Sequence, residues 1–215
     1  ETIGGLPLLS DTLTTLWAEM QAGDQGVLRW SDPPSQGVNV ALKLAERAEA
    51  FVQAHPDQRN VIRKLFCVHL AHVPNQGDPT RKSIWLDDLS ADERTLITEL
   101  SGPDQRILTT GDRDGRAYAE VAHEALFDAW KELRKWISER RGFYAWATEV
   151  ESDRADYEKE GRRRSALLTG RPLERAKAFM ETDADDIPEL DGHYIRTSIK
   201  RQKTFRILTS CGVGL

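Results

Sequence analysis

Residues Ala119–Ile137 read AEVAHEALFDAWKELRKWI. Tyr118–Val121 has the pattern of a short strand, and the spacing of the apolar residues after His123 predicts a helix. His123 therefore lies where a strand passes into a helix, and one of its ring nitrogens is a hydrogen-bond donor near the helix start. Because phosphate groups bind at such positions, the junction predicts a phosphate contact. The alternative is a helical domain with a buried histidine.

The residues before this stretch predict a small sheet between helices. A helix is expected over residues 58–72 and a short strand over residues 82–86. Ser90 and Glu93 have the spacing of a capping box, in which each side chain bonds the backbone N–H of the other residue. A strand, a turn with glycine and a returning strand follow, over Ile107–Thr110, Asp112–Gly115 and Ala117–Val121. Helix, strand, helix and two-stranded wing is the order of a winged helix.

Helices are expected on both sides of this region. Pro7 suits the first turn of an N-terminal helix, where its missing N–H is not needed, and a second helix is expected over residues 38–54. From His123 the sequence predicts helix almost to the end, restarting at Gly170 and again at Pro188. The expected fold is mainly α, with a helical lid (1–55), a winged-helix domain with a small sheet and wing (56–122), a helical extension (123–207), and a tail that is a linker or the start of a membrane segment (208–215).

The composition is that of a globular protein. The 215 residues are 39% hydrophobic and 30% charged with a net charge of −5, so the chain lacks the basic character of nucleic-acid-binding domains. Cys67 and Cys211 form neither a disulfide framework nor a metal cluster, so we expect a cytoplasmic location. No run of about 18 apolar residues is present. Residues 200–206 are basic and precede a short apolar stretch, an order found at the edges of membrane helices. A membrane partner is expected only through residues beyond Leu215.

Three separated motifs resemble those of one known family. They are Gly5-Leu6-Pro7-Leu8-Leu9-Ser10, Val121-Ala122-His123-Glu124-Ala125-Leu126 before a Trp-rich helix, and Leu168-Thr169-Gly170-Arg171-Pro172-Leu173. In this order they are similar to motifs of the bacterial STAND NTPases, in particular the class often followed by WD repeats. The resemblance covers nearly the whole chain. It implies the segment after the nucleotide-binding domain of a signalling ATPase: a small helical domain, a winged helix and a helical region before sensor repeats.

The resemblance implies two nucleotide contacts. Pro7 matches the proline of the family's G-x-P motif, which packs on the adenine side of the nucleotide; an ordinary proline in a first helical turn is the alternative. His123 matches the histidine that in relatives reaches from the winged helix to the β-phosphate of ADP. The triplet here is Ala-His-Glu rather than Met-His-Asp, so no role follows for Glu124.

The chain contains no G-x-x-x-x-G-K-[ST] phosphate loop, whose amides and lysine hold a triphosphate. ADP or ATP is therefore expected as a cofactor only together with a nucleotide-binding domain that this segment lacks. The segment alone is not expected to be an enzyme.

Other candidate sites are set aside on chemical grounds. A zinc-protease helix needs His-Glu-x-x-His, but Phe127 stands in place of the second histidine. His69 and His72 have helical spacing without a third ligand nearby, and we expect packed or surface histidines instead of a metal site. No nucleophile context is present, so no catalytic and no metal-binding residue is assigned. The acidic residues 183–186 are expected to cap helices or solvate a loop.

The expected function is regulatory. The segment would close over bound ADP through Pro7 and His123 and would open on exchange for ATP. The expected partners are the protein's own nucleotide-binding and sensor-repeat domains, with homo-oligomerisation of the complete protein. Residues 91–100, the second helix of the winged helix, carry three acids and one arginine, which argues against DNA binding. The alternatives are a scaffold that binds a partner protein through its tryptophan-bearing helices, without a nucleotide role, and a regulator tethered to a membrane by its tail.

Overall fold

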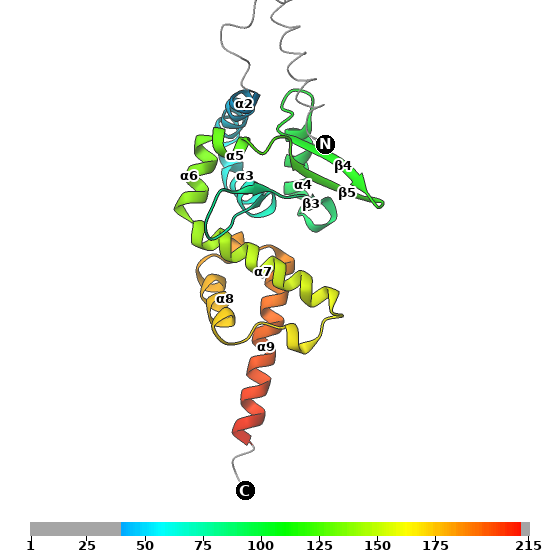
Figure 1. Ribbon diagram of the computed structural model, residues 1–215, viewed down its shortest axis with the longest axis vertical. Helices are drawn as coiled ribbons and strands as arrows, with labels where there is room; N and C mark the ends of the chain where they lie inside the picture. Colours follow the sequence, from blue (N-terminus) through cyan, green and yellow to red (C-terminus); the bar gives the residue numbers. More distant parts are fainter. Residues whose placement is uncertain (1–39, 212–215) are drawn as a thin grey trace, which may run out of the picture. The chain divides into compact units, whose positions relative to one another are not determined.

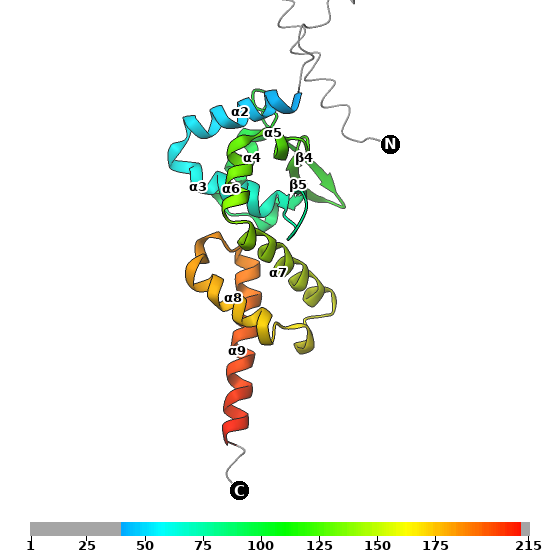
Figure 2. The ribbon, with the colours of Figure 1, turned by 60° about the vertical axis from the view of Figure 1, so that its left-hand side comes forward.

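The computed structural model describes residues 40–211, with side chains as far as Thr204. The predicted N-terminal helix with Pro7 and residues 212–215 lie outside the described residues. The described chain is mainly helical with small antiparallel sheets, which confirms the expected fold class (Figures 1 and 2). Its residues form two compact units, one with residues 40–71 and 79–138 and one with residues 72–78 and 139–211. None of the described helices is both long enough and apolar enough to cross a bilayer.

The first unit begins with two helical segments. Helix α2 (Val40–Ala54) packs through one apolar side, made of Leu44, Ala45, Ala48, Phe51 and Val52. A 3-10 turn, η1 (Pro56–Gln58), leads into α3 (Arg59–Lys64). The predicted helix over residues 58–72 ends early, because a π-helical turn, η2 (Leu65–His69), follows α3 and the backbone is then extended in the short strand β1 (Ala71–His72). All five side chains of this wider turn are buried.

A three-stranded sheet and one helix complete the middle of the first unit. Strand β2 (Thr80–Arg81) precedes β3 (Ile84–Trp85), the 3-10 turn η3 (Leu86–Asp88) and α4 (Ala91–Ser101). Strands β4 (Leu108–Arg113) and β5 (Arg116–Val121) follow, and the sheet has the antiparallel order β3-β5-β4.

The turn between β4 and β5 has two residues, Asp114 and Gly115. Both have positive φ, 55° and 75°, as a type I′ hairpin turn requires. Gly115 donates its N–H to Oδ1 of Asp112 (3.0 Å). Because the turn fixes the register, Leu108 pairs with Val121 at the far end of the hairpin.

The carboxylate of Glu93 is the central polar group of this unit. Its Oε2 accepts hydrogen bonds from N–H (2.9 Å) and Oγ–H (2.7 Å) of Ser90, and Ser90 Oγ accepts the N–H of Glu93 (3.3 Å). The predicted capping box is therefore confirmed. The other oxygen, Oε1, lies 3.1 Å from Nε2 of His69, and both side chains are 7% exposed. Burial would raise the pKa of Glu93, but His69 and Ser90 outweigh burial and lower it from 4.5 to about 2.

The helix predicted to run on from His123 is interrupted. Helix α5 (Leu126–Ala129) ends at Trp130, whose φ of −83° and ψ of 103° are extended, and α6 (Lys131–Glu139) begins after it. Helix α5 and all of α6 up to Ser138 lie in the first unit, whereas the boundary predicted from the sequence lies between residues 122 and 123. The division into lid, winged helix and extension stays a prediction.

The second unit is built from three long helices. They are α7 (Arg141–Lys159), α8 (Gly170–Thr182) and α9 (Glu189–Cys211), with the 3-10 turns η4 (Arg164–Ala166) and η5 (Ala184–Asp186) between them. Helix α8 starts where the Gly170-Arg171-Pro172 pattern predicted. Trp146 of α7 packs against Phe179 of α8 with ring centroids 4.5 Å apart. Tyr194 of α9 donates its hydroxyl to O of Ala166 (2.8 Å).

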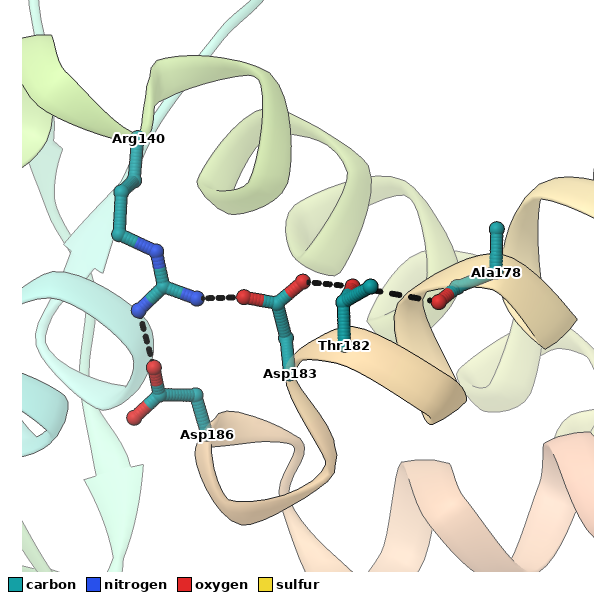
Figure 3. Close-up of polar contacts among 5 residues, drawn as sticks. All are labelled: Arg140, Ala178, Thr182, Asp183 and Asp186. Atoms are coloured by element: carbon teal, nitrogen blue, oxygen red, sulfur yellow. Dashed lines mark hydrogen bonds and ion pairs between the residues drawn. The ribbon is translucent and has the colours of Figure 1, made fainter.

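Arg140 joins the start of α7 to the connection between α8 and α9 (Figure 3). Its guanidinium binds Asp186 through Nη1 and Asp183 through Nη2, and it lies 4.6 Å from the centroid of the Phe143 ring. Asp183 also bonds the hydroxyl of Thr182. The expectation that residues 183–186 only cap helices or solvate a loop is wrong for Asp183 and Asp186, because both are paired with Arg140 and are 19% and 13% exposed.

Glu93 predicts an acid-sensitive component of stability. Because its carboxyl has a pKa near 2 when folded, against 4.5 otherwise, its stabilising effect is complete above that higher value and is lost as the pH falls from 4.5 towards 2. The pKa shift corresponds to on the order of 3 kcal/mol. We expect Glu93→Gln to lower the free energy of unfolding at neutral pH. The difference from wild type, measured by urea denaturation, should narrow through this pH range; a constant difference would contradict the pairing.

Because Arg140 binds two aspartates, we expect arginine at this position to stabilise the fold more than lysine would. The single ammonium group of a lysine cannot reproduce the fork that binds two carboxylates, so Arg140→Lys should lower the free energy of unfolding by about 1–2 kcal/mol. Arg175→Lys is the matched control, because Arg175 and its partner Glu149 are 42% and 46% exposed and such pairs contribute little. Thermal unfolding of both variants tests this. A control that loses as much stability as Arg140→Lys would refute the special role of Arg140.

Candidate functional site

His123 lies two residues beyond Val121, the last residue of strand β5. The N–H of Ala122 donates to O of Ile107 (3.0 Å), which continues the pairing of β5 with β4 towards His123. The carbonyl oxygen of His123 accepts the N–H of Leu126 (3.0 Å) and opens the turn into α5. The structure therefore places His123 between a strand and a helix, as the sequence predicts. Its side chain is half-buried.

The imidazole of His123 has a defined orientation. Its Nδ1 accepts the backbone N–H of Ala125 at 3.1 Å. A neutral imidazole that accepts at Nδ1 carries its proton on Nε2. Nε2–H is therefore the donor that His123 can offer to another group. A phosphate oxygen is an acceptor that fits such a donor.

Two acidic side chains hold the backbone on either side of His123. Glu124 Oε1 accepts the N–H of Arg81 (3.1 Å), and Glu120 accepts hydrogen bonds from Ser83 Oγ (2.7 Å) and from the Arg81 guanidinium (3.4 Å). The end of β2 and Ser83, which follows it, are thereby joined to residues on both sides of His123. No role for Glu124 follows from the sequence, and the structure shows a local one: its carboxylate binds the Arg81 N–H and so fixes the residue next to His123.

The helix after His123 is shorter than the sequence predicts. Residues 124 and 125 form a turn, and α5 has four residues before the break at Trp130. The dipole of so short a helix is small, so the helix start adds little to the binding of an anion. A phosphate contact at this junction would therefore depend on the His123 side chain.

Trp130 holds the segment after His123 to the rest of the first unit. It is 1% exposed, and its indole N–H donates to Oε2 of Glu49 on α2 (2.9 Å). Its ring meets the edges of Phe66 and Trp136 at centroid distances of 5.0 and 5.5 Å. The backbone is thus extended at the residue whose indole is buried in the core and bonded to α2.

The other candidate residues give no second site. Pro7 lies outside the described residues. His69 is a buried residue beside Glu93, one of the two placements, packed or surface, that the sequence predicts for it. Among residues 40–204, no group of three or more His, Cys, Asp or Glu side chains is placed to hold a metal ion.

A cavity of about 240 Å³ lies in the second unit, between α7 and α8. Trp146, Asp153 and Arg175 are among its lining residues. The lining also includes three residues of the third sequence motif: Leu168, Arg171 and Pro172. His123 is not among the lining residues, so the third motif and the histidine motif do not contribute to one site at this cavity.

Several residues that hold the site were missed from the sequence. Glu49 accepts a hydrogen bond from Trp130, which lies 81 positions later in the chain. Arg81 donates one to Glu124, which lies 43 positions later. Helical and strand periodicities relate residues only a few positions apart, so neither pair has a signal in them. Glu49 and Glu124 stand among many other surface acids in the sequence.

A sequence model of the family described as Novel STAND NTPase 1 matches residues 1–165. The chain belongs to this family. Of the three motifs, those around Pro7 and His123 lie inside the range that matches the Novel STAND NTPase 1 family, whereas residues 168–173 lie beyond it. The expected relation to STAND NTPases is confirmed. Neither the curated proteins nor the solved structures include a match to the chain.

The Glu49–Trp130 contact predicts a measurable coupling in this family member. Trp130→Phe keeps most of the buried ring but removes the N–H that bonds the half-buried carboxylate, so we expect a loss of about 1–3 kcal/mol of unfolding free energy. The loss should shrink when Glu49→Ala is already present, because alanine removes the acceptor of this bond, as a double-mutant cycle would measure. Trp136→Phe is the matched control, because Trp136 is buried in the same cluster at 5% exposure. Strict additivity of Trp130→Phe and Glu49→Ala would show that the bond contributes nothing.

Proposed function

We propose that this chain is the regulatory segment of a STAND-type signalling ATPase. In the complete protein it closes over ADP held by a nucleotide-binding domain, and it opens when ATP replaces ADP. The observation that carries the proposal is the orientation of His123: the N–H of Ala125 occupies Nδ1, so Nε2–H is the donor offered to the nucleotide. Membership of the STAND family supports the nucleotide as the partner of that donor.

The order and pairing of elements support a winged helix as the part that carries His123. Helix α3, strand β3, helix α4 and the β4–β5 hairpin follow one another, and β5 is the central strand of the three. The hairpin with its two-residue turn corresponds to the wing. His123 leaves the central strand at the end opposite that turn, where Leu108 pairs with Val121. A rotation of this domain as a body would carry His123 towards or away from the nucleotide.

The energy of one such contact is sufficient for regulation. A hydrogen bond between an imidazole and a charged phosphate contributes about 1.5–3 kcal/mol. Since each 1.4 kcal/mol changes an equilibrium about tenfold, the bond favours the closed arrangement by about 10- to 100-fold. ADP needs only to bind the closed arrangement better than the open one for exchange to shift the population. The open arrangement would then expose surfaces for oligomerisation, with sensor repeats of the WD type as the source of the triggering signal.

In the scaffold alternative a partner protein binds the tryptophan-bearing helices. Trp130, Trp136 and Trp146 are 1%, 5% and 3% exposed and are core residues of their units, so a partner of these helices would contact their other side chains. The exposed side of α4 carries Asp92, Glu99 and Arg94, a charge balance that opposes DNA phosphates.

The proposal is tested by His123→Ala in the complete protein, nucleotide-binding domain included. We expect ADP to be released about 10- to 100-fold faster, because the bond to the phosphate is absent. Release of a fluorescent ADP analogue, measured by stopped flow, gives the rate. Basal activity should rise in parallel.

Glu124→Gln is the matched control for this experiment. Its side-chain amide oxygen still accepts the N–H of Arg81, so the His123 segment keeps its position and ADP release should stay at the wild-type rate. The proposal is wrong if His123→Ala leaves both ADP release and basal activity unchanged. An equally large effect of Glu124→Gln would assign the regulation to the whole segment rather than to the imidazole.

A further inference from the structure

The last helix carries a charge opposite to that of the chain as a whole. After Asp191 no Asp or Glu follows, whereas five Lys or Arg residues do: Arg196, Lys200, Arg201, Lys203 and Arg206. The complete chain has a net charge of −5. Such an asymmetry concentrates positive potential on one segment of an acidic protein and is typical of a surface that meets an anionic partner.

One arginine and two lysines of α9 lie on one side of the helix together with a histidine, whereas Arg201 lies off this side. The packed side of α9 consists of Asp191, Tyr194, Ile195 and Ser198, which are 4%, 2%, 0% and 1% exposed. The exposed side carries His193, Arg196, Lys200 and Lys203, separated by three, four and three residues. This spacing places the four on one face of an α-helix. We call these four residues the basic stripe.

The basic stripe is long and straight. Helical rise over the ten residues from His193 to Lys203 gives it a length of about 15 Å. Figures 1 and 2 show the C-terminal part of α9 continuing beyond α7 and α8 of the same unit. The contact of α8 with this part lies on the other side, where Lys177 donates to Oε1 of Gln202 (2.6 Å). Side chains of the stripe therefore face away from α8.

We propose that the basic stripe of α9 binds the headgroups of anionic phospholipids. The choice of a lipid surface rests on the sequence that follows these basic residues: Ile207-Leu208-Thr209-Ser210-Cys211-Gly212-Val213-Gly214-Leu215 contains no charged residue. Basic residues followed directly by uncharged, mostly apolar ones match the change from headgroups to hydrocarbon in a bilayer. A nucleic acid or an acidic protein segment would use the charges but would leave the apolar continuation without a role.

This surface is independent of His123, which lies in the other compact unit. The partner is recognised by charge and not by the structure of one headgroup, so phosphatidylserine serves as the probe. Each basic side chain near such a surface strengthens binding by a similar factor, and the attraction weakens as salt rises.

The test is co-sedimentation of the 215-residue chain with phosphatidylcholine vesicles that contain or lack phosphatidylserine. We expect binding only when phosphatidylserine is present, and release at high salt. The variant Arg196→Gln/Lys200→Gln/Lys203→Gln, which neutralises the three Lys and Arg residues of the stripe, should bind roughly a hundredfold more weakly. All three side chains are exposed, so the variant should keep the circular dichroism and thermal transition of the wild type.

The matched control is Arg162→Gln/Arg163→Gln/Arg164→Gln. These three arginines are also exposed and lie in the same unit, and their replacement changes the net charge by the same amount. Unchanged vesicle binding by this control supports the basic stripe as the surface. An equal loss in both variants would show attraction to the overall charge and would overturn the proposal. So would the absence of binding to phosphatidylserine vesicles, or binding to duplex DNA in place of vesicles.

Discussion

The first unit depends on the contacts that the buried carboxylate of Glu93 makes with Ser90 and His69. One of its oxygens closes the start of α4 through Ser90, and the other lies beside His69 in the π-helical turn. Helix α4 is thereby tied to the end of α3. The other end of α4 passes on to the sheet, where the N–H of Ile107 donates to O of Leu100 (2.9 Å). A buried carboxylate without these partners would be strongly destabilising.

The position of His123 follows from this arrangement. The β4–β5 hairpin starts next to α4, its two-residue turn fixes the register, and β5 returns to deliver His123 beside the start of the hairpin. The bonds from Ala125 to the ring and from Arg81 to Glu124 then orient the imidazole. A histidine held by both backbone and side chain loses little conformational entropy when Nε2–H meets an acceptor, which favours a role as a contact that forms and breaks. In the proposed function that acceptor is the nucleotide, and membership of the STAND family supports this proposal.

The sequence predicted local features well and long-range ones poorly. The capping box at Ser90, the Asp114–Gly115 turn and the start of α8 at Gly170 are encoded by residues a few positions apart, and all three are present. The break at Trp130 was missed, because its helical periodicity continues through residue 130 while the bond to Glu49 comes from 81 positions away. The pairing of Arg140 with two aspartates was missed for the same reason. Tertiary contacts of this kind override local propensity.

The tautomer of the His123 ring shows whether Nε2–H is the donor that this residue offers. Nitrogen-15 NMR of the imidazole, at a pH where the ring is neutral, distinguishes a protonated from an unprotonated ring nitrogen. The structure predicts an unprotonated Nδ1, which accepts the N–H of Ala125, and a proton on Nε2. In the ADP-bound complete protein the Nε2–H resonance should shift and become protected from exchange with water. A proton on Nδ1, or an Nε2–H resonance indifferent to ADP, would contradict the account.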